Sequence, residues 1–389
     1  MGLKVLSLFD GISCGMVALE RVGFEVERYV SYEIEQSAIK ISQKNYPKIE
    51  QCGDVRTADF SQYKGFDLLI GGSPCQDLSN YKYDRGEVKG LNGEKSSLFY
   101  YYVKALKEVK PKYFLLENVA SMEKKWADVI SEELGVEPIM INSALVCAAE
   151  RKRLYWTNIP NINQPKDKGI VLKDIIISAD EVSDKYWYTK YPVTVHDGDV
   201  KVKATIHLNG HRQAKEVYGL NYKCNTLLCD GNGGNLAKKV YQDKRVRRLT
   251  PLEYERLQTL PDNYTDCVAD SRRYTAIGNG WTVDVIAHIF SFMKDCNREN
   301  EIKIIIGTLF KLKSETSIYT ILYCGKVWNK YLLYNQNLKT FKLVKSTWIT
   351  EHIKRIQFCK CNETKMKFRK KLAKAKKERY IMEHGCYRN

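Results

Sequence analysis

The stretch that most constrains the fold is Phe66–Ser79, which reads FDLLIGGSPCQDLS. Its first part, Phe66–Ile70, is a short apolar run, which predicts a parallel strand buried on both faces. Two glycines then permit a sharp bend, and Pro74 fixes the backbone just before Cys75. Because ligands bind at the carboxyl ends of strands in open α/β sheets, this pattern predicts a nucleophilic thiol at a ligand site.

The residues before this stretch alternate between strand and helix patterns. Residues 3–9 predict a strand that leads through a glycine turn into a helix, the usual entry to a nucleotide-type cofactor site. The glycines do not spell G-x-G-x-x-G, which argues against a dinucleotide. A second strand, Val26–Tyr32, is expected to end at Glu33, whose carboxylate would either bind ribose hydroxyls or lie in solvent. After a helix over Glu35–Asn45, a short third strand is expected to end at Asp54, a candidate for an adenine amino group.

A second carboxylate follows an apolar strand further along the chain. Residues 80–97 are polar and contain three glycines, which is typical of a loop that closes over a substrate. A helix over Leu98–Val109 is then expected, followed by a strand over Tyr113–Leu116. Glu117 comes directly after that strand, so we expect it near Cys75.

Two arginines alternate after a further strand, which is predicted over Pro138–Leu145. With a period of two, Arg151 and Arg153 would point to the same side of a strand. Two cations on one side near a cleft indicate either phosphate and base contacts or a solvated edge.

The regular alternation stops at about Asn161, and a smaller, irregular domain that reads a partner is expected up to residue 245. A helix is expected at Thr250–Leu260, with Thr250 as its cap and Pro251 in its first turn. The last part of the chain predicts a β-rich module with strands at Lys303–Leu312, Ile318–Tyr323, Tyr331–Tyr334 and Thr340–Val344. The expected divisions are a catalytic domain (1–160), a recognition domain (161–245), a return to the catalytic domain (246–296) and an extension (297–389).

The charge of the chain favours a polyanionic partner. The net charge is +17 and the sequence pI is about 9.2, and segment 365–379 is rich in lysine and arginine. Such a segment is either attracted to phosphate or a solvated surface helix. The twelve cysteines form no C-x-x-C pair, which indicates a reduced, cytoplasmic protein without structural metal. No signal peptide is visible, and no apolar run approaches the roughly 18 residues of a membrane span.

An ordered set of motifs resembles the cytosine-5 DNA methyltransferase family. The motifs are LFDGISCG, YEIE, GDVR, GGSPCQDLS, LLENV, RKRLYW, RRLTPLEYERLQTLPDNYT and AIGNGWTVDVI, and together they span roughly residues 3–292. Several are similar to motifs of the vertebrate de novo enzymes, whereas NTLLCDGNGGN resembles the recognition region of phage and bacterial members. The resemblance implies an α/β fold: a Rossmann-like class I methyltransferase domain with a mixed, mostly parallel sheet, a smaller irregular target-recognition domain, and a C-terminal β-rich basic extension.

The resemblance implies S-adenosylmethionine as cofactor and no metal. In this family Glu33 would bind the ribose, Asp54 the adenine, and the turn at Asn279 the methionine part. The expected cofactor-binding residues are Phe9, Gly11, Ile12, Ser13, Glu33, Ile34, Asp54, Val55, Pro74, Asn279, Gly280 and Trp281.

The resemblance also implies a mechanism. Cys75 would add to carbon 6 of cytosine, Glu117 would engage the ring nitrogen and the exocyclic amine, and Arg153, paired with Arg151, would hold the carbonyl oxygen. The base must leave the duplex to be reached. The expected DNA contacts are Ser79, Asn225, Thr226, Asn232 and Asn235.

The expected partner is double-stranded DNA, methylated by a monomer in a bacterial or phage-infected cell. Two alternatives remain open: an RNA (tRNA) cytosine-5 methyltransferase, and a catalytically silent DNA-binding relative. The size of segment 161–245 favours base readout in the DNA major groove over the first. The presence of Cys75 and Glu117 argues against the second.

Overall fold

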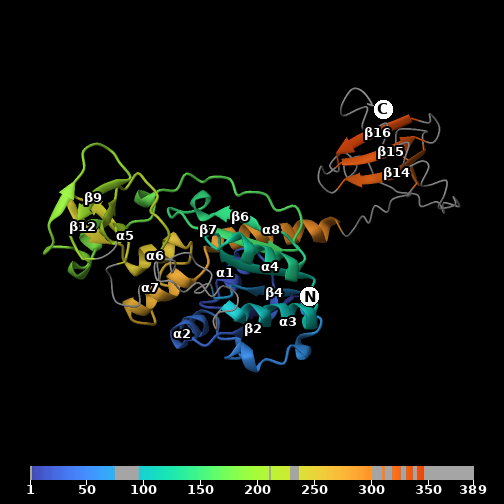
Figure 1. Cartoon of the computed structure of the whole chain (residues 1–389), viewed down its shortest axis with the longest axis horizontal. Helices are drawn as coiled ribbons and strands as arrows, with labels where there is room; N and C mark the ends of the chain where they lie inside the picture. Colours follow the sequence, from blue (N-terminus) through green and yellow to red (C-terminus); the bar gives the residue numbers. More distant parts are fainter. Residues whose placement is uncertain are drawn as a thin grey trace. The chain divides into compact units, whose positions relative to one another are not determined.

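The computed structural model describes residues 2–74, 96–209, 212–227 and 236–299, and four strands in the remainder of the chain (Figure 1). Cys75, Ser79, Asn232 and Asn235 lie outside the described residues, as does the expected loop except for its last two positions. The chain divides into two compact units, Met1–Cys296 and Asn297–Asn389.

The first unit is built on a seven-stranded sheet with the order β3-β2-β1-β4-β5-β7-β6. Strands β1 to β5 pair in parallel, whereas β7 runs antiparallel to both of its neighbours, β5 and β6. The expected mixed, mostly parallel sheet is therefore confirmed. The strands are β1 (Leu3–Leu8), β2 (Val26–Tyr32), β3 (Glu50–Gln51), β4 (Leu68–Gly71), β5 (Tyr113–Val119), β6 (Ile139–Asn142) and β7 (Lys152–Thr157).

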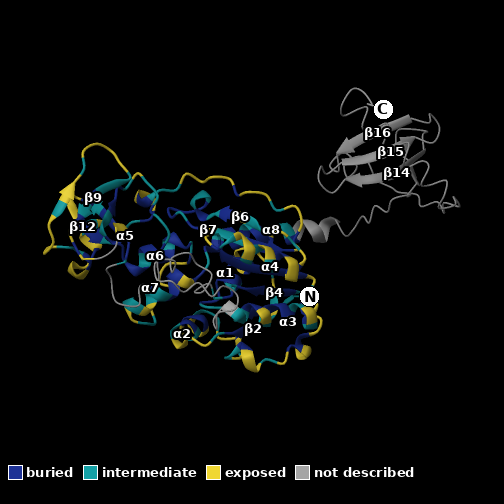
Figure 2. Ribbon diagram, viewed as in Figure 1, coloured by how far each residue is buried: buried dark blue, intermediate teal, exposed yellow. Residues whose placement is uncertain are grey.

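Helices cover both faces of this sheet. Side chains alternate along the strands, so that Val5 and Ile70 pack in the cluster that contains α1, α2 and α8, whereas Leu6 and Leu69 pack in the cluster that contains α3 and α4. Both faces are therefore buried, and Figure 2 shows the middle of the sheet in dark blue. The covering helices are α1 (Cys14–Val22), α2 (Gln36–Asn45), α3 (Phe99–Val109), α4 (Lys124–Leu134) and α8 (Val283–Glu299).

Two strands of the large sheet give way to 3-10 turns earlier than the sequence pattern indicated. The third strand ends at Gln51, because the Asp54 carboxylate accepts a hydrogen bond from the Arg56 backbone N–H and caps a 3-10 turn. The strand expected over Pro138–Leu145 ends at Asn142, whose side chain caps another 3-10 turn. In both places a short polar side chain competes with the strand for backbone hydrogen bonds.

The segment expected to be irregular contains a second sheet, so that expectation was wrong. Its strands, in the order β12-β11-β10-β9-β8, are β8 (Val193–Val195), β9 (Val202–Ile206), β10 (Glu216–Tyr218), β11 (Lys239–Gln242) and β12 (Arg245–Arg248). None exceeds five residues, which is too short for a clear apolar pattern. The sheet also continues past residue 245. In Figure 1 it lies at one end of the first unit, beyond α6 (Pro251–Leu257) and α7 (Asp270–Asn279).

The second sheet is tied to α6 by a buried ion pair. Both guanidinium N–H groups of Arg247, on β12, donate to the carboxylate of Glu253, at 2.8 and 2.6 Å, and neither side chain is exposed. Glu253 also closes a capping box with Thr250. The cap predicted at Thr250 is confirmed, although the helix ends at Leu257.

The second unit contains an antiparallel four-stranded sheet with its strands in sequence order. The strands are β13 (Leu309–Lys311), β14 (Ile318–Gly325), β15 (Lys330–Asn335) and β16 (Thr340–Lys345). The basic segment 365–379 lies outside the described residues.

Candidate active site

The loop that follows β1 has an unusual backbone. Phe9, Gly11 and Ser13 have φ angles of 58°, 60° and 58°, in the left-handed region. Only glycine adopts this region freely, and each other residue costs about 1–3 kcal/mol there. Other contacts must therefore hold the loop in this shape.

Asp10, which the sequence argument did not single out, supplies those contacts. Its partly buried carboxylate accepts hydrogen bonds from Ser7 Oγ and Ser13 Oγ at 2.5 Å, Tyr29 OH at 2.7 Å and Ser31 Oγ at 3.2 Å. Burial raises the pKa of Asp10 above its usual range, and the hydrogen bonds from Ser13, Ser7 and Tyr29 oppose that rise. The sequence feature that could have indicated this network is an acidic residue in the turn, Asp10, with serines three positions before and after it, Ser7 and Ser13.

Glu33 lies at the end of β2 and contacts the same loop. Its carboxylate accepts hydrogen bonds from the backbone N–H groups of Gly11, Ile34 and Glu35, each at 2.8 Å. Three donors fix its orientation, and a carboxylate can accept further bonds. Asp54 pairs with the Arg56 guanidinium, which holds the pKa of that carboxyl below its ordinary value.

The turn between α7 and α8 is anchored by Arg151. The Arg151 guanidinium donates to the carbonyls of Gly278 and Gly280, at 3.0 and 3.2 Å, and Gln258 Nε2 donates to the Gly280 carbonyl at 3.0 Å. Arg151 is buried, so it does not lie at a solvated edge as one expectation had it. The turn that contains Trp281 is thus fixed against the segment before β7.

Glu117, on β5, is almost fully buried and has an ion-pair partner on one oxygen and a hydrogen-bond donor on the other. Arg153 Nε lies 2.7 Å from Oε1, and Trp281 Nε1 donates to Oε2 at 3.1 Å. A Cβ on Gly72 would lie 3.2 Å from Glu117 Oε2, so the backbone after β4 approaches this carboxylate closely. The structure therefore brings Glu117, Arg153 and Trp281 together, beside the strand that leads to Cys75.

The backbone just before Cys75 is tied to β5. Asn118 Nδ2 lies 3.3 Å from the Ser73 carbonyl and 3.1 Å from Ser73 Oγ. Asn118 is buried, as is Ser73. The path of the chain up to Pro74 is therefore fixed relative to Glu117.

Two of the expected DNA contacts make bonds within the protein. Thr226 Oγ1 donates to the Glu150 carbonyl at 2.7 Å, and Lys201 Nζ donates to Asn225 Oδ1 at 3.0 Å. A parallel bridge joins Ala149 and Cys224. These contacts connect the second sheet to the segment that leads into Arg151.

Two buried thiols are expected to resist alkylation. Burial raises the pKa of Cys14 and of Cys224 to about 12, so both stay protonated near neutral pH, whereas Cys52 is exposed. The thiolate fraction of Cys14 and Cys224 is therefore about three orders of magnitude lower than that of a free cysteine. Iodoacetamide treatment of the native protein, read by peptide mass spectrometry, should label Cys52 well before the two buried thiols. Equal labelling rates in the native protein would contradict this, and all three should react in denaturant.

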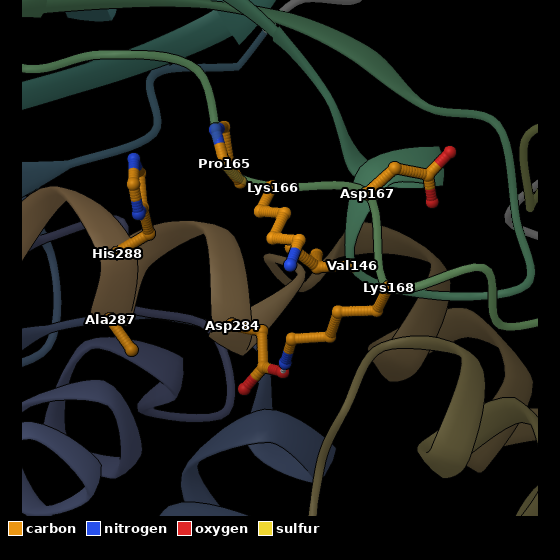
Figure 3. Close-up of a pocket in the computed structure, with 8 residues that line it drawn as sticks. All are labelled: Val146, Pro165, Lys166, Asp167, Lys168, Asp284, Ala287 and His288. Atoms are coloured by element: carbon orange, nitrogen blue, oxygen red, sulfur yellow. Dashed lines mark hydrogen bonds and ion pairs between the residues drawn. The ribbon is translucent and has the colours of Figure 1, made fainter.

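A groove of about 660 Å³ is lined by none of the residues expected to be catalytic, to bind the cofactor or to contact DNA. Figure 3 shows its lining, with the Lys168 amine against the Asp284 carboxylate, an ion pair at the start of α8. The lining residues are Val146, Pro165, Lys166, Asp167, Lys168, Asp284, Ala287 and His288.

Among the described residues, no group of three or more His, Cys, Asp or Glu side chains is placed to hold a metal ion. None of the helices in the described ranges is both long and apolar enough to cross a membrane.

Comparison with protein families identifies the chain. A family model, the C-5 cytosine-specific DNA methylase, matches residues 3–135 and 145–295. The chain belongs to this family. It is a DNA cytosine-5 methyltransferase, and members of the family use S-adenosylmethionine.

Curated relatives and solved structures agree with this assignment. The methyltransferase is 28% identical over 319 residues to the type II methyltransferase M1.ScrFI of Lactococcus lactis subsp. cremoris, covering 73% of this chain and 76% of the relative. It is 40% identical over 122 residues to the orphan methyltransferase M.Rho11sI of Bacillus phage rho11s, covering 31% and 24%. The fold is similar to that of the Entamoeba histolytica methyltransferase EhMeth, with a TM-score of 0.61, 17% identity and coverage of 76% and 99%.

Proposed function

We propose that this methyltransferase transfers a methyl group from S-adenosylmethionine to carbon 5 of a cytosine flipped out of duplex DNA, through a covalent adduct with Cys75. The observation that carries the proposal is the Glu117–Arg153 pair, which lies against the backbone that leads directly to Cys75. A carboxylate beside a guanidinium offers hydrogen-bonding groups of both kinds to the edge of one base.

The residues around the β1 loop fit the cofactor. Glu33 has a fixed carboxylate with capacity for ribose hydroxyls, and a Cβ on Gly11 would meet no atom within 4 Å, so this turn faces open space. Phe9, Ile12 and Ser13 from the same loop, together with Ile34, Asp54, Val55, Pro74, Asn279, Gly280 and Trp281, complete the proposed binding set. When bound, S-adenosylmethionine supplies a sulfonium methyl group.

The protein's own residues carry the remaining steps. Cys75, as a thiolate, forms a bond to carbon 6, which makes carbon 5 nucleophilic. Glu117 donates a proton to the ring nitrogen and accepts a hydrogen bond from the exocyclic amine, and Arg153 holds the carbonyl oxygen as charge develops on the ring. Carbon 5 gains the methyl group. A base then accepts the carbon-5 proton, the electron pair of that C–H bond restores the double bond between carbons 5 and 6, and the sulfur of Cys75 leaves carbon 6 as a thiolate. Arg151 contributes by fixing the turn at Gly280.

We further propose that the sheet of β8–β12 is the core of a target-recognition region, with DNA contacts at Ser79, Asn225, Thr226, Asn232 and Asn235. The bridge between Ala149 and Cys224 supports this assignment, because it joins the segment between β10 and β11 to the segment that precedes β7. The basic extension would add phosphate contacts. The enzyme would act as a monomer in a bacterial or phage-infected cell.

Replacing Asn232 or Asn235 by Ala is expected to change which sequences are methylated more than it changes the turnover number. Amide side chains read base edges in the major groove, and one good pair is worth about 1–3 kcal/mol of discrimination. Base-resolution methylation profiles of each variant would check this, with Asn158→Ala, a residue bonded to Phe114 and Lys112, as the control. A profile identical to that of the wild type would refute the assignment.

The proposed function is tested by base-resolution methylation sequencing of DNA from cells that express the full-length enzyme or its Cys75→Ala variant. The wild type should methylate cytosines within one short recurring sequence, and the variant should methylate none. A wild-type profile no higher than that of the variant would overturn the proposal.

A further inference from the structure

The indole of Trp281 lies between two glycines from different elements. A Cβ on Gly72, after β4, would lie 3.0 Å from Trp281 Nε1, and a Cβ on Gly15, in α1, would lie 3.7 Å from the far edge of the ring. A side chain on Gly72 would therefore displace the ring. Because Gly72 has no side chain, the indole can lie with its N–H edge close to the backbone after β4.

That orientation aims the indole N–H at Glu117. Nε1 donates to Oε2 at 3.1 Å, while Arg153 occupies Oε1 at 2.7 Å. A carboxylate with an ion pair on one oxygen and a hydrogen bond on the other cannot rotate about its last bond without disturbing both contacts. The direction in which Glu117 presents its remaining lone pairs is set by Trp281 and Arg153 together.

The contacts link β5, β7, the residue just before β7 and the turn before α8. Arg153 pairs with Glu117 across β7 and β5, and Glu117 is bonded to Trp281. The backbone of Trp281 continues from Gly280, whose carbonyl accepts from Arg151. Because Arg151 and Arg153 are two residues apart, a shift of the turn would be transmitted to Glu117 from both sides.

We infer that Trp281 is a positioning residue for Glu117, and that its N–H couples the cofactor turn to the cytosine pocket. The inference rests on the proposed function, since it takes Glu117 as the group that holds the base. Loss of the hydrogen bond from Trp281 to the Glu117 carboxylate should slow methyl transfer by about tenfold to a hundredfold, because hydrogen bonds to charged groups are stronger than those between neutral groups.

The test compares Trp281→Phe with Trp156→Phe. Both changes remove one indole N–H bond, but Trp156 Nε1 donates to Ser131 Oγ at 3.0 Å, on the buried face toward α4. The substrate is a duplex that contains the sequence found by methylation mapping. For Trp281→Phe we expect kcat to fall about tenfold or more. Because phenylalanine keeps an aromatic ring at this place in the cofactor-binding set and removes only the N–H donor and part of the ring, the KM for S-adenosylmethionine and the calorimetric Kd for S-adenosylhomocysteine should stay within about threefold of wild type. Trp156→Phe should keep the wild-type kcat.

A double-mutant cycle shows whether Trp281 acts through Glu117. Trp281→Phe should weaken binding of the target duplex in the presence of S-adenosylhomocysteine, but should weaken it no further when Glu117→Ala is already present. Additive losses would overturn the inference, as would a Trp281→Phe variant that loses cofactor affinity while its kcat is unchanged. Both overturning results can be seen only with an active wild-type enzyme. Failure of the proposed function would look different, because the wild type would then show no Cys75-dependent methylation.

Discussion

Glu117→Gln should lower kcat for methyl transfer by about 10²–10⁴-fold, the range that a positioned acid–base group contributes. Glutamine keeps the size of the side chain and one acceptor oxygen, but it loses the charge that Arg153 neutralises at 2.7 Å. The glutamine amide also cannot transfer a proton to the ring nitrogen of the cytosine when Cys75 adds to carbon 6. The measurement is a single-turnover rate on the mapped duplex with saturating S-adenosylmethionine.

The control for this prediction is Glu50→Gln, which changes a carboxylate that is also paired with an arginine. Glu50 and Arg28 form a two-bond ion pair, with both bonds at 2.8 Å, on exposed parts of β3 and β2. Loss of an exposed pair costs about 0–1 kcal/mol and should leave the rate unchanged. A Glu117→Gln variant as fast as Glu50→Gln would remove Glu117 from the mechanism. Binding of S-adenosylhomocysteine should be the same in both variants.

The centre of the large sheet could be predicted from the sequence because β4 and the first part of β5 are continuous apolar runs. A buried parallel strand such as β4 or β5 requires apolar residues on both faces, so a carboxylate at the end of the apolar run, as at Glu117, is easily seen, although β5 continues to Val119 and not only to the expected Leu116. The same argument identified Glu33 at the end of β2. These positions depend on local sequence alone.

The second sheet and the network at Asp10 could not be predicted in this way. Strand β10 pairs with β11 in parallel and with β9 in the opposite direction, so its three residues are stabilised by partners that are distant in sequence. Asp10 accepts hydrogen bonds from Tyr29 and Ser31, which lie close to it because β2 pairs with β1. Trp281 and Glu117 are 164 residues apart. No local sequence pattern predicts the hydrogen bond between Trp281 and Glu117, because only the folded chain brings the two residues together.

Arg247→Met is expected to lower the free energy of unfolding by about 3–5 kcal/mol, because it leaves the Glu253 carboxylate buried without its cation. Neither side chain of the pair is exposed, and the Arg247 guanidinium makes both bonds to Glu253 and one to Gln242 Oε1 at 2.6 Å. Glu253 cannot move to solvent, because it also accepts from the backbone N–H groups of Thr250 and Ile177. Urea denaturation followed by tryptophan fluorescence would measure the loss.

The double variant Arg247→Met/Glu253→Gln separates the cost of a buried charge from the cost of lost packing. If the unpaired carboxylate causes most of the loss, the second substitution should recover part of it, since glutamine is neutral and can still accept from Thr250. The surface pair provides the comparison: Arg28→Met should cost less than about 1 kcal/mol. Equal losses for Arg247→Met and Arg28→Met would show that the pair does not hold the second sheet to α6. A double variant less stable than Arg247→Met alone would instead assign the main role of Glu253 to its capping bonds, which the fold requires whether or not Arg247 is present.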